Sequence, residues 1–534
     1  MLNTENFIFS PCEAHAAEQQ WRIVKRSVDA RQRELKVHLT VLTDDEGKPI
    51  AKDAPISLYA PPVFQDVHAA KRSAVIIGAG PAGLFAALTL LEHGIKPIIF
   101  ERGKEVSERK KDIALLNRNE GFNPESNYCF GEGGAGTFSD GKLFSRSKKR
   151  GNMQRVMELF HYFGAPDTVL YEAHAHIGSD KLPTIIKRMR ECILEHGGII
   201  HFETKIESLK SLTGTESSGL TGEAGLSLAL PTILAVGHSA HDTYRMLAAE
   251  GVAMETKGFA MGVRAEHPQA LINQLMYHLS PKSVCTLSAK RSNSETVCQQ
   301  SGLIDFVGNA SYSLVTQVDG RGVYSFCMCP GGHIVPAGSE NGACVVNGMS
   351  ASHRNSPFAN SGMVVQINPE DIPGDDPLRG LEYQESLERL AFEQSQRSQQ
   401  LIANSQQPTT APAQRLRDFV EGRASKDLPS CSYLPGIVPS RLDQWLPAHI
   451  GKRLQQGFRD FDRKYPGFLT NEAVIVGVES RSSSAVRIVR DPETLQSVST
   501  PNLYPCGEGA GYAGGITSSA LDGINAALKI AEVS

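Results

Sequence analysis

The chain has 534 residues, of which 40% are hydrophobic and 21% are charged, so it can form several globular domains with large buried cores. Its formal net charge of -4 at pH 7 gives no reason to expect a nucleic acid or an anionic membrane surface as a partner. Ten cysteines spread along the chain, with no C-x-x-C motif among them, exclude a secreted disulfide framework.

The start of the chain carries no targeting pattern. The first twenty residues lack a basic region followed by an apolar core, and the first arginine is Arg22, so we expect neither a secretory signal nor a transit peptide. The most apolar stretch, residues 226–236, contains Pro231 and is about half the ~20 residues that a membrane span needs. We therefore expect a cytoplasmic protein with no membrane partner.

Residues 1–65 differ in pattern from the rest of the chain. Apolar positions alternate at Val37, Leu39 and Val41, which predicts a strand, and the stretches DEGKP and DAPISLYAPPVF then predict a turn and a Pro-rich connection. The segment is too short for a large core, so we expect a small N-terminal α+β domain that docks on the main body.

The stretch SAVIIGAGPAGLFAALTLLEHGIKPIIFER, residues 73–102, has the pattern of one βαβ unit. The apolar runs at 74–77 and 97–100 predict two buried parallel strands, and residues 84–91 predict the helix between them. Three glycines and an acid then stand where a dinucleotide site needs them.

The roles of these residues follow from their geometry. Gly78 permits the tight turn, Gly80 lets the backbone approach a pyrophosphate, and Gly83 lets helix and strand pack closely. The helix N-terminus offers free N–H groups to the diphosphate. Glu101 can accept hydrogen bonds from a ribose diol, and its charge disfavours the 2′-phosphate of NADP, so FAD and NAD remain. The predicted cofactor-binding residues here are Gly78, Gly80, Pro81, Ala82, Gly83, Glu101 and Arg102.

A glycine-rich segment, NYCFGEGGAGTFSDGKLFSRSKKRG, occupies residues 127–151. Its glycines would suit a flexible surface loop, but aromatic residues are interleaved with them, which a solvated linker would not need. We therefore predict a loop that lies along the cofactor. Its predicted cofactor-binding residues are Gly134, Gly136, Thr137, Gly141 and Lys142.

Residues 152–250 continue with helices and strands in alternation, which predicts further strands of the same parallel sheet. We assign residues 71–250 to the first part of a dinucleotide-binding domain and add Ile206 and Gly237 to its predicted cofactor contacts.

From residue 251 to 468 short strand-like runs are punctuated by glycine, which predicts an inserted β-rich α+β substrate domain. It also contains a helical pattern at 382–403, and we predict a mobile loop over the Gln/Ser/Thr/Pro-rich residues 394–413. Cys327 and Cys329 would share one face of a strand, as a metal pair, a redox pair or, the interpretation we favour, cysteines that are buried or packed closely beside a ligand. We predict no metal site.

The last 66 residues, 469–534, decide between FAD and NAD. A strand ends in YPCGEGAG, and Gly514 and Gly515 open a helix. NAD dehydrogenases complete their site with consecutive βαβ units, whereas FAD proteins of the glutathione-reductase type return to the cofactor with a C-terminal strand, Gly-acid turn and helix. The pair of glycine-rich turns therefore indicates FAD. The predicted contacts here are Gly507, Glu508, Gly514, Gly515 and Ile516.

The chain resembles the two-dinucleotide-fold FAD-dependent oxidoreductases of the glutathione-reductase type, and more narrowly a family of bacterial and plastid FAD-dependent dehydrogenases. The resemblance covers nearly the whole chain and is carried by KRSVDAR (25–31), GAGPAGLFAA (78–87), FGEGGAGTFSDGKL (130–143), AVGHSAHDTY (235–244), CMCPGGHIVPA (327–337), NGMSASHRNSPFANS (347–361), VESRSSSAVRI (478–488) and YPCGEGAGYAGGITSSALDG (504–523). It implies FAD as cofactor and leaves the substrate open.

The expected fold is therefore α/β. A Rossmann-like FAD-binding domain, a three-layer ββα arrangement with a parallel sheet, is interrupted by the inserted β-rich α+β substrate domain and preceded by the small N-terminal α+β domain.

The expected function is an FAD-dependent oxidoreductase that acts on a small molecule at the flavin N5, with catalytic candidates Cys329, His333, Arg354 and Arg481 and with Asn360 and Ser483 nearby. Arg354 and Arg481 could clamp an anionic substrate, and His333 could act as acid or base. The sequence shows no second glycine-rich βαβ unit, so NAD(P)H would bind only transiently, or electrons would come from the substrate or a carrier protein. A flavoprotein with a binding or assembly role and a flavin-dependent RNA-modifying enzyme remain as alternatives.

Overall fold

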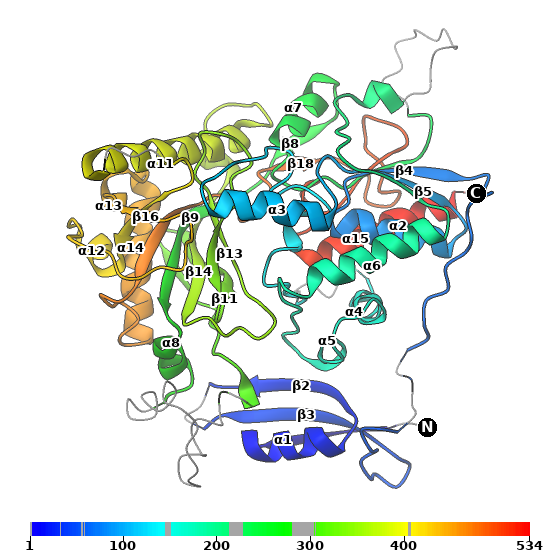
Figure 1. Ribbon diagram of the computed structural model, residues 1–534, viewed down its shortest axis with the longest axis horizontal. Helices are drawn as coiled ribbons and strands as arrows, with labels where there is room; N and C mark the ends of the chain where they lie inside the picture. The colour runs from blue at the N-terminus through cyan, green and yellow to red at the C-terminus, as the bar shows by residue number, and fades with distance from the viewer. Residues whose placement is uncertain are drawn as a thin grey trace.

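The computed structural model describes residues 3–31, 34–54, 57, 59–144, 151–212, 228–279, 304, 306–403 and 407–533. In these ranges a small N-terminal unit lies below two larger bodies, one built on a parallel sheet and one on a mostly antiparallel sheet (Figure 1).

The N-terminal unit consists of β1 (Asn3–Phe9), α1 (Pro11–Gln20), β2 (Ile23–Asp29) and β3 (Lys36–Thr43), with the antiparallel strand order β1-β3-β2. The alternating residues of β3 are buried against Ala14 and Ala17 of α1, as the period-2 pattern predicts. Arg26 of β2 joins this unit to the rest of the chain, since its guanidinium donates to Glu172 at 2.9 Å and to the Phe306 carbonyl at 2.8 Å.

The parallel sheet has five strands in the order β19-β7-β4-β5-β6. Their bounds are β4 (Ser73–Ile77), β5 (Lys96–Phe100), β6 (Ile199–His201), β7 (Thr232–Leu234) and β19 (Leu503–Pro505). β19 pairs in parallel with β7, so the end of the chain returns to the sheet that the βαβ unit began.

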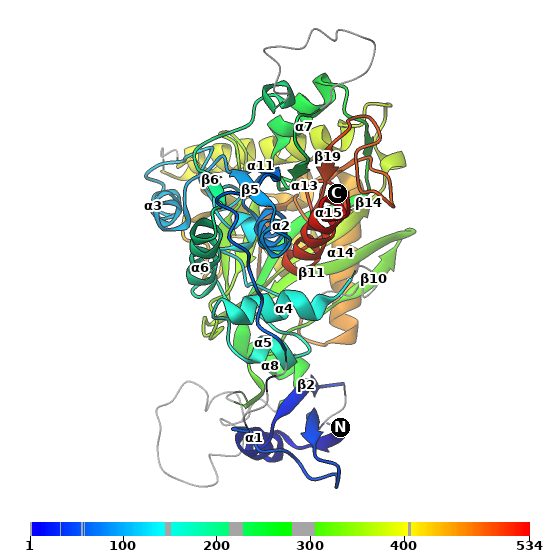
Figure 2. The ribbon, with the colours of Figure 1, turned by 90° about the vertical axis from the view of Figure 1, so that its right-hand side faces the viewer.

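This sheet lies in the middle of three layers. One face packs against α2 (Pro81–Glu92), α4 (Met153–Tyr162), α6 (Leu182–Glu195) and α15 (Ile516–Glu532). The other face packs against α7 (His241–Ala249) and the small pair β8 (Met254–Thr256) and β18 (Val486–Ile488). Figure 2 shows α2 and α15 side by side, with α7 beyond the sheet. The expected α/β class with a parallel sheet is confirmed.

The second body is a seven-stranded sheet in the order β10-β11-β14-β9-β17-β15-β16. Its strands are β9 (Phe259–Pro268), β10 (Val315–Val318), β11 (Arg321–Cys329), β14 (Phe358–Ile367), β15 (Ala411–Arg415), β16 (Ile437–Pro439) and β17 (Val474–Glu479). The hairpin of β12 (His333–Pro336) and β13 (Val346–Met349) accompanies it. Helices of this half are α8 (Gln269–Met276), α11 (Arg379–Ala403), α12 (Leu416–Glu421), α13 (Leu442–Trp445) and α14 (Ala448–Lys464).

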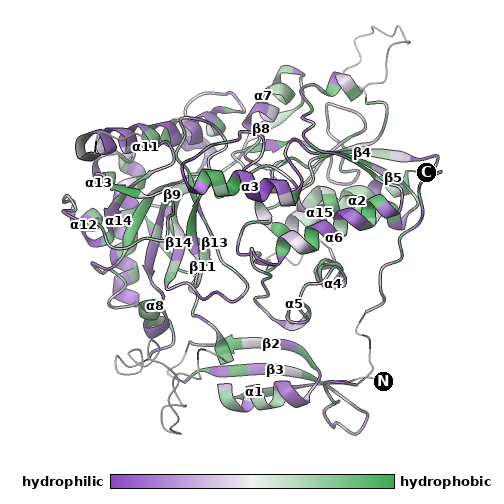
Figure 3. Ribbon diagram, in the orientation of Figure 1, coloured by the Kyte–Doolittle hydropathy of each residue, from purple (hydrophilic) through white to green (hydrophobic). Residues whose placement is uncertain are grey.

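Two expectations for this body differ from the structure. The mobile loop predicted over 394–413 is wrong, because α11 continues through Ala403 and β15 begins at Ala411, while residues 404–406 lie outside the described part. Figure 3 shows that α11 consists largely of hydrophilic residues. The Gln and Ser residues that suggested a loop are therefore compatible with a helix. β17 lies beyond residue 468 but pairs with β9 and β15, so the antiparallel sheet extends into the segment assigned to the C-terminal return.

Two short helices complete the elements that position the site, α3 (Val106–Asn117) and α5 (Thr168–Tyr171). None of the helices in the described part of the chain has the length and apolarity that crossing a bilayer would need.

Candidate functional site

The turn after β4 leaves backbone groups free to hold a diphosphate. Gly78 has a φ of +104°, and Gly80 caps α2, whose first residue is Pro81. A Cβ at Gly83 would collide with the Gly78 carbonyl oxygen, so this position requires glycine. A Cβ at Gly80 would meet nothing closer than the Gly134 Cα at 3.8 Å, so the turn faces the glycine-rich loop.

Glu101 lies at the end of β5 and organises the backbone around the turn. Its Oε2 accepts from the Ala79 N–H at 2.8 Å, and its Oε1 accepts from the N–H groups of Gly103 at 2.9 Å and Gly131 at 3.1 Å. The carboxylate therefore ties three loops together. Oε2 keeps one lone pair, which fits the predicted contact to a ribose hydroxyl.

The glycine-rich loop is held by Arg109 of α3, a residue that the sequence analysis did not single out. The fully buried guanidinium donates to the carbonyls of Asn127 (2.8 Å), Tyr128 (3.1 Å), Glu132 (2.8 Å) and Gly134 (2.8 Å). Burial lowers the pKa of Arg109 to about 10, against the opposing effect of Glu101. The loop is therefore a fixed wall and not a flexible linker.

Three other predicted cofactor contacts of this region also have partners within the protein. Arg102 is paired with Glu125 at 2.6 Å and Asp242 at 2.8 Å, and it stacks over the Phe130 ring at 4.1 Å. The Thr137 hydroxyl donates to the Glu132 carbonyl at 3.1 Å. Ile206 packs against the apolar cluster on the α7 face of the sheet.

The C-terminal turn meets the first one, as the paired glycine motifs predict. A Cβ at Gly523 of α15 would collide with the Ala82 carbonyl oxygen of α2, and one at Gly136 would lie 3.0 Å from Ile516. Asp522, also absent from the sequence analysis, fixes the turn by accepting from the Gly507 N–H at 2.7 Å.

Three predicted glycines face open space, unlike the packing glycines above. A Cβ at Gly237, Gly514 or Gly515 would meet no atom within 4 Å. Beside them the Glu508 side chain is 24% exposed, with its Oε1 3.5 Å from Nδ1 of His238. Burial raises the pKa of Glu508 to about 7 and lowers that of His238 to about 3, so the folded protein favours the neutral form of both groups.

These observations fit a dinucleotide of the FAD type. A diphosphate flanked by two sugar-like chains requires glycines with open space beside them, a helix N-terminus and an acid at each end. The site offers all of these, with Glu101 and Glu508 as the two acids. We call the residues 78–83, 101, 131–141, 237–238 and 507–516 the cofactor cradle. Lys142, predicted as a cofactor contact, extends toward β11, with its Nζ 3.8 Å from Sγ of Cys329.

The predicted arginine clamp is corrected by the structure, because both arginines already hold a carboxylate. Arg481 donates to Glu388 at 2.7 and 2.9 Å and to the Ser339 hydroxyl at 2.7 Å, and it is buried. Arg354 donates to Asp140 at 2.5 and 3.1 Å. Neither charge is left over for a ligand.

The two cysteines do not share a face. A bulge between Phe326 and Cys329 interrupts the pairing of β11 with β14, and Cys327 has a φ of +44°. Cys327 is exposed and Cys329 buried, with the Cys329 Sγ 3.5 Å from Nη2 of Arg264 and 3.8 Å from Nζ of Lys142. The i, i+2 rule fails here because a bulge cannot be read from the pattern.

Arg264 and Glu479 form a buried ion pair at 2.9 Å in the middle of this sheet. The Arg264 Nε also donates to Oδ1 of Asn360 at 2.8 Å, while Nδ2 of Asn360 is a buried donor with no partner in the described part. His333 stands at the exposed start of β12, where burial lowers its pKa. Ser483 lies near α11, since its carbonyl accepts from Gln384 at 3.4 Å.

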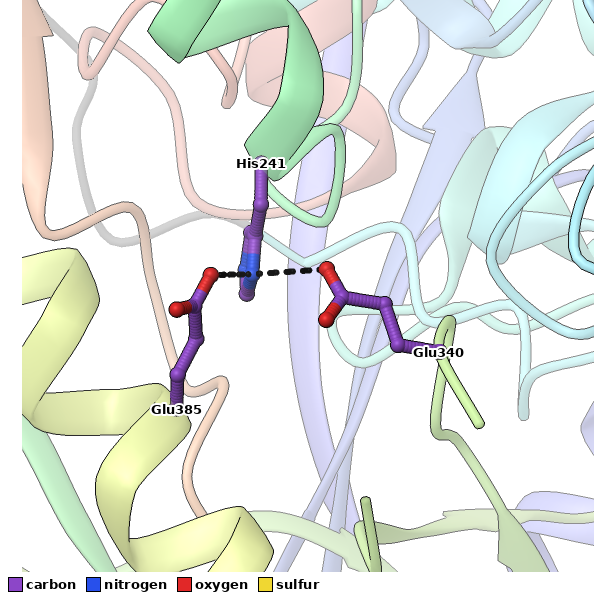
Figure 4. A group of neighbouring side chains, drawn as sticks. All are labelled: His241, Glu340 and Glu385. Carbon is purple, nitrogen blue, oxygen red and sulfur yellow. Dashed lines mark hydrogen bonds and ion pairs between the residues drawn. The ribbon is translucent and has the colours of Figure 1, made fainter. Parts of the chain in front are cut away.

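His241 lies between two carboxylates that come from distant parts of the chain (Figure 4). Its Nδ1 is 3.0 Å from Glu385 and 3.7 Å from Glu340. The sequence analysis could not predict this group of three side chains, because its members lie about 100 and about 45 residues apart along the chain. Arg245 binds both oxygens of Glu385, at 2.6 and 2.7 Å, so this carboxylate is already neutralised by a cation and the geometry favours an ion-pair network.

Comparison with known proteins agrees with this cradle. Residues 71–123 match the model of an FAD binding domain, and residues 258–482 match the model described as "FAD-dependent protein, C-terminal domain-like". Among solved structures, the halogenase PltM has a TM-score of 0.32 at 13% identity, covering 86% of this chain and 69% of its own. The protein FqzB has a TM-score of 0.31 at 12% identity, covering 88% of this chain and 81% of its own. At such scores the likeness supports no inference about this chain.

A sequence relative is much closer. An uncharacterised protein of Clostridium beijerinckii is 39% identical over 527 residues, covering 96% of this chain and 92% of the relative. The chain therefore belongs to the family of this Clostridium protein and carries the FAD-binding domain and the C-terminal domain of FAD-dependent proteins.

Proposed function

We propose that the protein is an FAD-dependent oxidoreductase, a dehydrogenase or reductase, that acts on a small molecule at the flavin N5. The observation that carries the proposal is the cofactor cradle, in which two glycine-rich turns from opposite ends of the chain meet around open space beside Glu508. Bound FAD would supply a two-electron redox centre.

The residues of the cradle divide the binding between them. The backbone of Gly78–Gly83 and the N-terminus of α2 would hold the diphosphate, and Glu101 the adenosine ribose. Glu508 would accept from the ribityl chain, and the backbone at Gly514 and Gly515 would face the ring system. The return of the chain as β19 and α15 supports membership of the glutathione-reductase-type proteins, close to the bacterial and plastid FAD-dependent dehydrogenases.

The proposal also covers the source of the electrons and the kind of partner that the protein binds. The sequence contains one glycine-rich βαβ unit, so we propose that NAD(P)H, if it is the donor, binds transiently and that the substrate or a carrier protein is the other source. The partner is a small molecule and not a nucleic acid or a membrane.

The test is the colour and the reduction of the purified protein. We expect it to be yellow, or to become yellow with added FAD, and to bleach under anaerobic conditions with NADH, NADPH or a member of a metabolite panel. Bleaching by NADH alone establishes a reductase half-reaction, and bleaching only by a metabolite indicates a dehydrogenase. A colourless protein that refuses FAD and accepts NAD contradicts the proposal.

A variant of the cradle gives the matched control. Gly514→Leu fills the open space at a position without positive φ, so we expect it to fold and to lose FAD. Gly121→Leu makes the same change at an exposed glycine outside the cradle, and it should keep FAD. Equal FAD content in the two variants would place the cofactor elsewhere.

A further inference from the structure

Lys142 lies between the cofactor cradle and the antiparallel sheet. The carbonyl of its neighbour Leu143 accepts from the Thr517 hydroxyl at 2.7 Å, which ties this point to the first turn of α15. On the other side its Nζ is 3.8 Å from Sγ of Cys329 on β11. The ammonium therefore lies at the junction of the two bodies.

The charges around Lys142 do not balance. Arg354 donates to both oxygens of Asp140, and Nζ of Lys142 lies 3.5 Å from Oδ2 of the same carboxylate. Two cations thus share one carboxylate. Burial and Arg354 lower the pKa of His176, so this neighbour is neutral at pH 7.

The charged groups beyond this cluster have partners of their own. Arg264 is bound to Glu479 at 2.9 Å, and Arg26 is bound to Glu172 at 2.9 Å and to Glu18 at 2.6 Å, where the N-terminal unit meets the rest of the chain. Within the cluster itself, Asp140, Arg354 and Lys142 sum to one positive charge.

The side chain is also accessible to a ligand. It is 36% exposed, and Cys327 beside it is exposed as well. Burial raises the pKa of the Cys327 thiol to about 12, so this thiol is neutral at pH 7 and does not compete for the ammonium as an anion.

We propose that Lys142 binds a carboxylate of the substrate, which makes the substrate a small organic acid with one negative charge near the reacting centre. This inference rests on the proposed oxidoreductase function. An ammonium donates strong, charge-assisted hydrogen bonds to a carboxylate. A phosphate dianion would need a second free cation, and the guanidinium groups of Arg354 and Arg481 are already engaged by Asp140 and Glu388.

The experiment measures FAD content and acid binding separately, on the FAD-loaded protein. The probes are a series of monocarboxylates from acetate to octanoate and benzoate, with benzamide as the uncharged analogue, titrated by calorimetry. The variant is Lys142→Met. Its matched control is Lys187→Met, which removes a half-exposed lysine of α6 that faces Glu191. Lys142→Arg tests for rescue by the retained charge.

We expect at least one acid to bind the unmodified protein and benzamide not to bind. Lys142→Met should keep FAD and weaken the acid by about 10- to 100-fold, which is the strength of one charge-assisted hydrogen bond. Lys187→Met should bind as the unmodified protein does, and Lys142→Arg should fall between the two.

Four outcomes overturn the assignment: a yellow protein that binds none of the acids, equal acid binding by Lys142→Met, loss of FAD from a folded Lys142→Met, and equal loss of binding in the Met and Arg variants. A protein that takes up no FAD contradicts the proposed function instead, so the two failures are distinguishable.

Discussion

At the scale of single residues, buried arginines fix the segments that surround the cofactor cradle. Arg264 and Arg481 are each paired with a buried glutamate, which offsets the cost of desolvating the charge. Arg109 is held mainly by backbone carbonyls, and this difference agrees with the lowered pKa of Arg109 and the raised pKa values of the other two. Such arginines shape the site without being free to bind a ligand.

Glu508 gives a prediction about pH. Its pKa in the folded protein, about 7, is above the ordinary value of 4.5, so the folded protein favours the protonated carboxyl. The stability that this preference contributes is complete below pH 4.5 and is lost as the pH rises through 7. In the apoprotein, Glu508→Gln should therefore gain stability over the unmodified protein between pH 5 and pH 8, by roughly 3 kcal/mol at most. Urea unfolding of both proteins at pH 5 and at pH 8 measures this gain in the free energy of unfolding. A stability difference between the two proteins that does not change with pH contradicts the prediction.

The residues that form the cradle or hold it in place divide into those that the sequence could identify and those that it could not. The glycines and Glu101 belong to one local motif, whose geometry fixes their roles. Arg109 sits beside Lys110 and Lys111 in a run of charged residues, and it alone of the three is buried. Its partners lie about twenty residues away, and only the folded loop brings them to it.

At the scale of elements, the close crossing of α2 and α15 positions the two halves of the cradle. Small residues line the contact, since a Cβ at Gly523 would collide with the Ala82 carbonyl and one at Gly507 would lie 3.0 Å from the Ala82 Cβ. The N-termini of both helices thereby point into the same region. The sequence predicted these helices and, through the alternation of helices and strands over 152–250, further strands of the parallel sheet beside those at 74–77, 97–100 and before Gly507. It could not assign β17, because the apolar run VIVGVE suits either sheet and only tertiary pairing decides.

Two glycines within helices therefore predict opposite results for the same substitution. Gly523→Ala should destabilise the protein by about 1–3 kcal/mol and weaken FAD binding, because α15 must move away from α2. Gly451→Ala in α14 places its Cβ 3.6 Å from the Leu446 Cβ, an ordinary contact, and should stabilise by up to about 1 kcal/mol through helix propensity. Chemical unfolding of both variants measures the difference. Stabilisation by both substitutions would mean that the crossing has room for a methyl group.

At the scale of the whole molecule, the cradle gathers segments from both ends of the chain. Residues 78–83 and 507–516 approach one another through α2 and α15, and the loop 131–141 leads to Lys142, which contacts the antiparallel sheet. An empty cradle leaves these segments joined only by protein contacts. A ligand that touches all of them therefore binds the folded chain and not the unfolded one.

Whole FAD should accordingly stabilise the folded protein more than riboflavin and AMP, the two halves of the cofactor, do together. Free FAD at 100 times its Kd adds about 2.7 kcal/mol to the free energy of unfolding, seen as a rise in Tm with FAD concentration. Riboflavin and AMP together should give a smaller rise at equal concentrations, because neither spans the distance between Glu101 and Glu508 and the diphosphate contacts at Gly78–Gly83 are lost. NAD serves as the control, since it shares the adenosine and diphosphate but lacks the flavin and its ribityl chain. A rise with NAD equal to that with FAD would mean that the C-terminal turn contributes nothing to cofactor binding, and the pairing of the two glycine-rich turns would then have only a structural purpose.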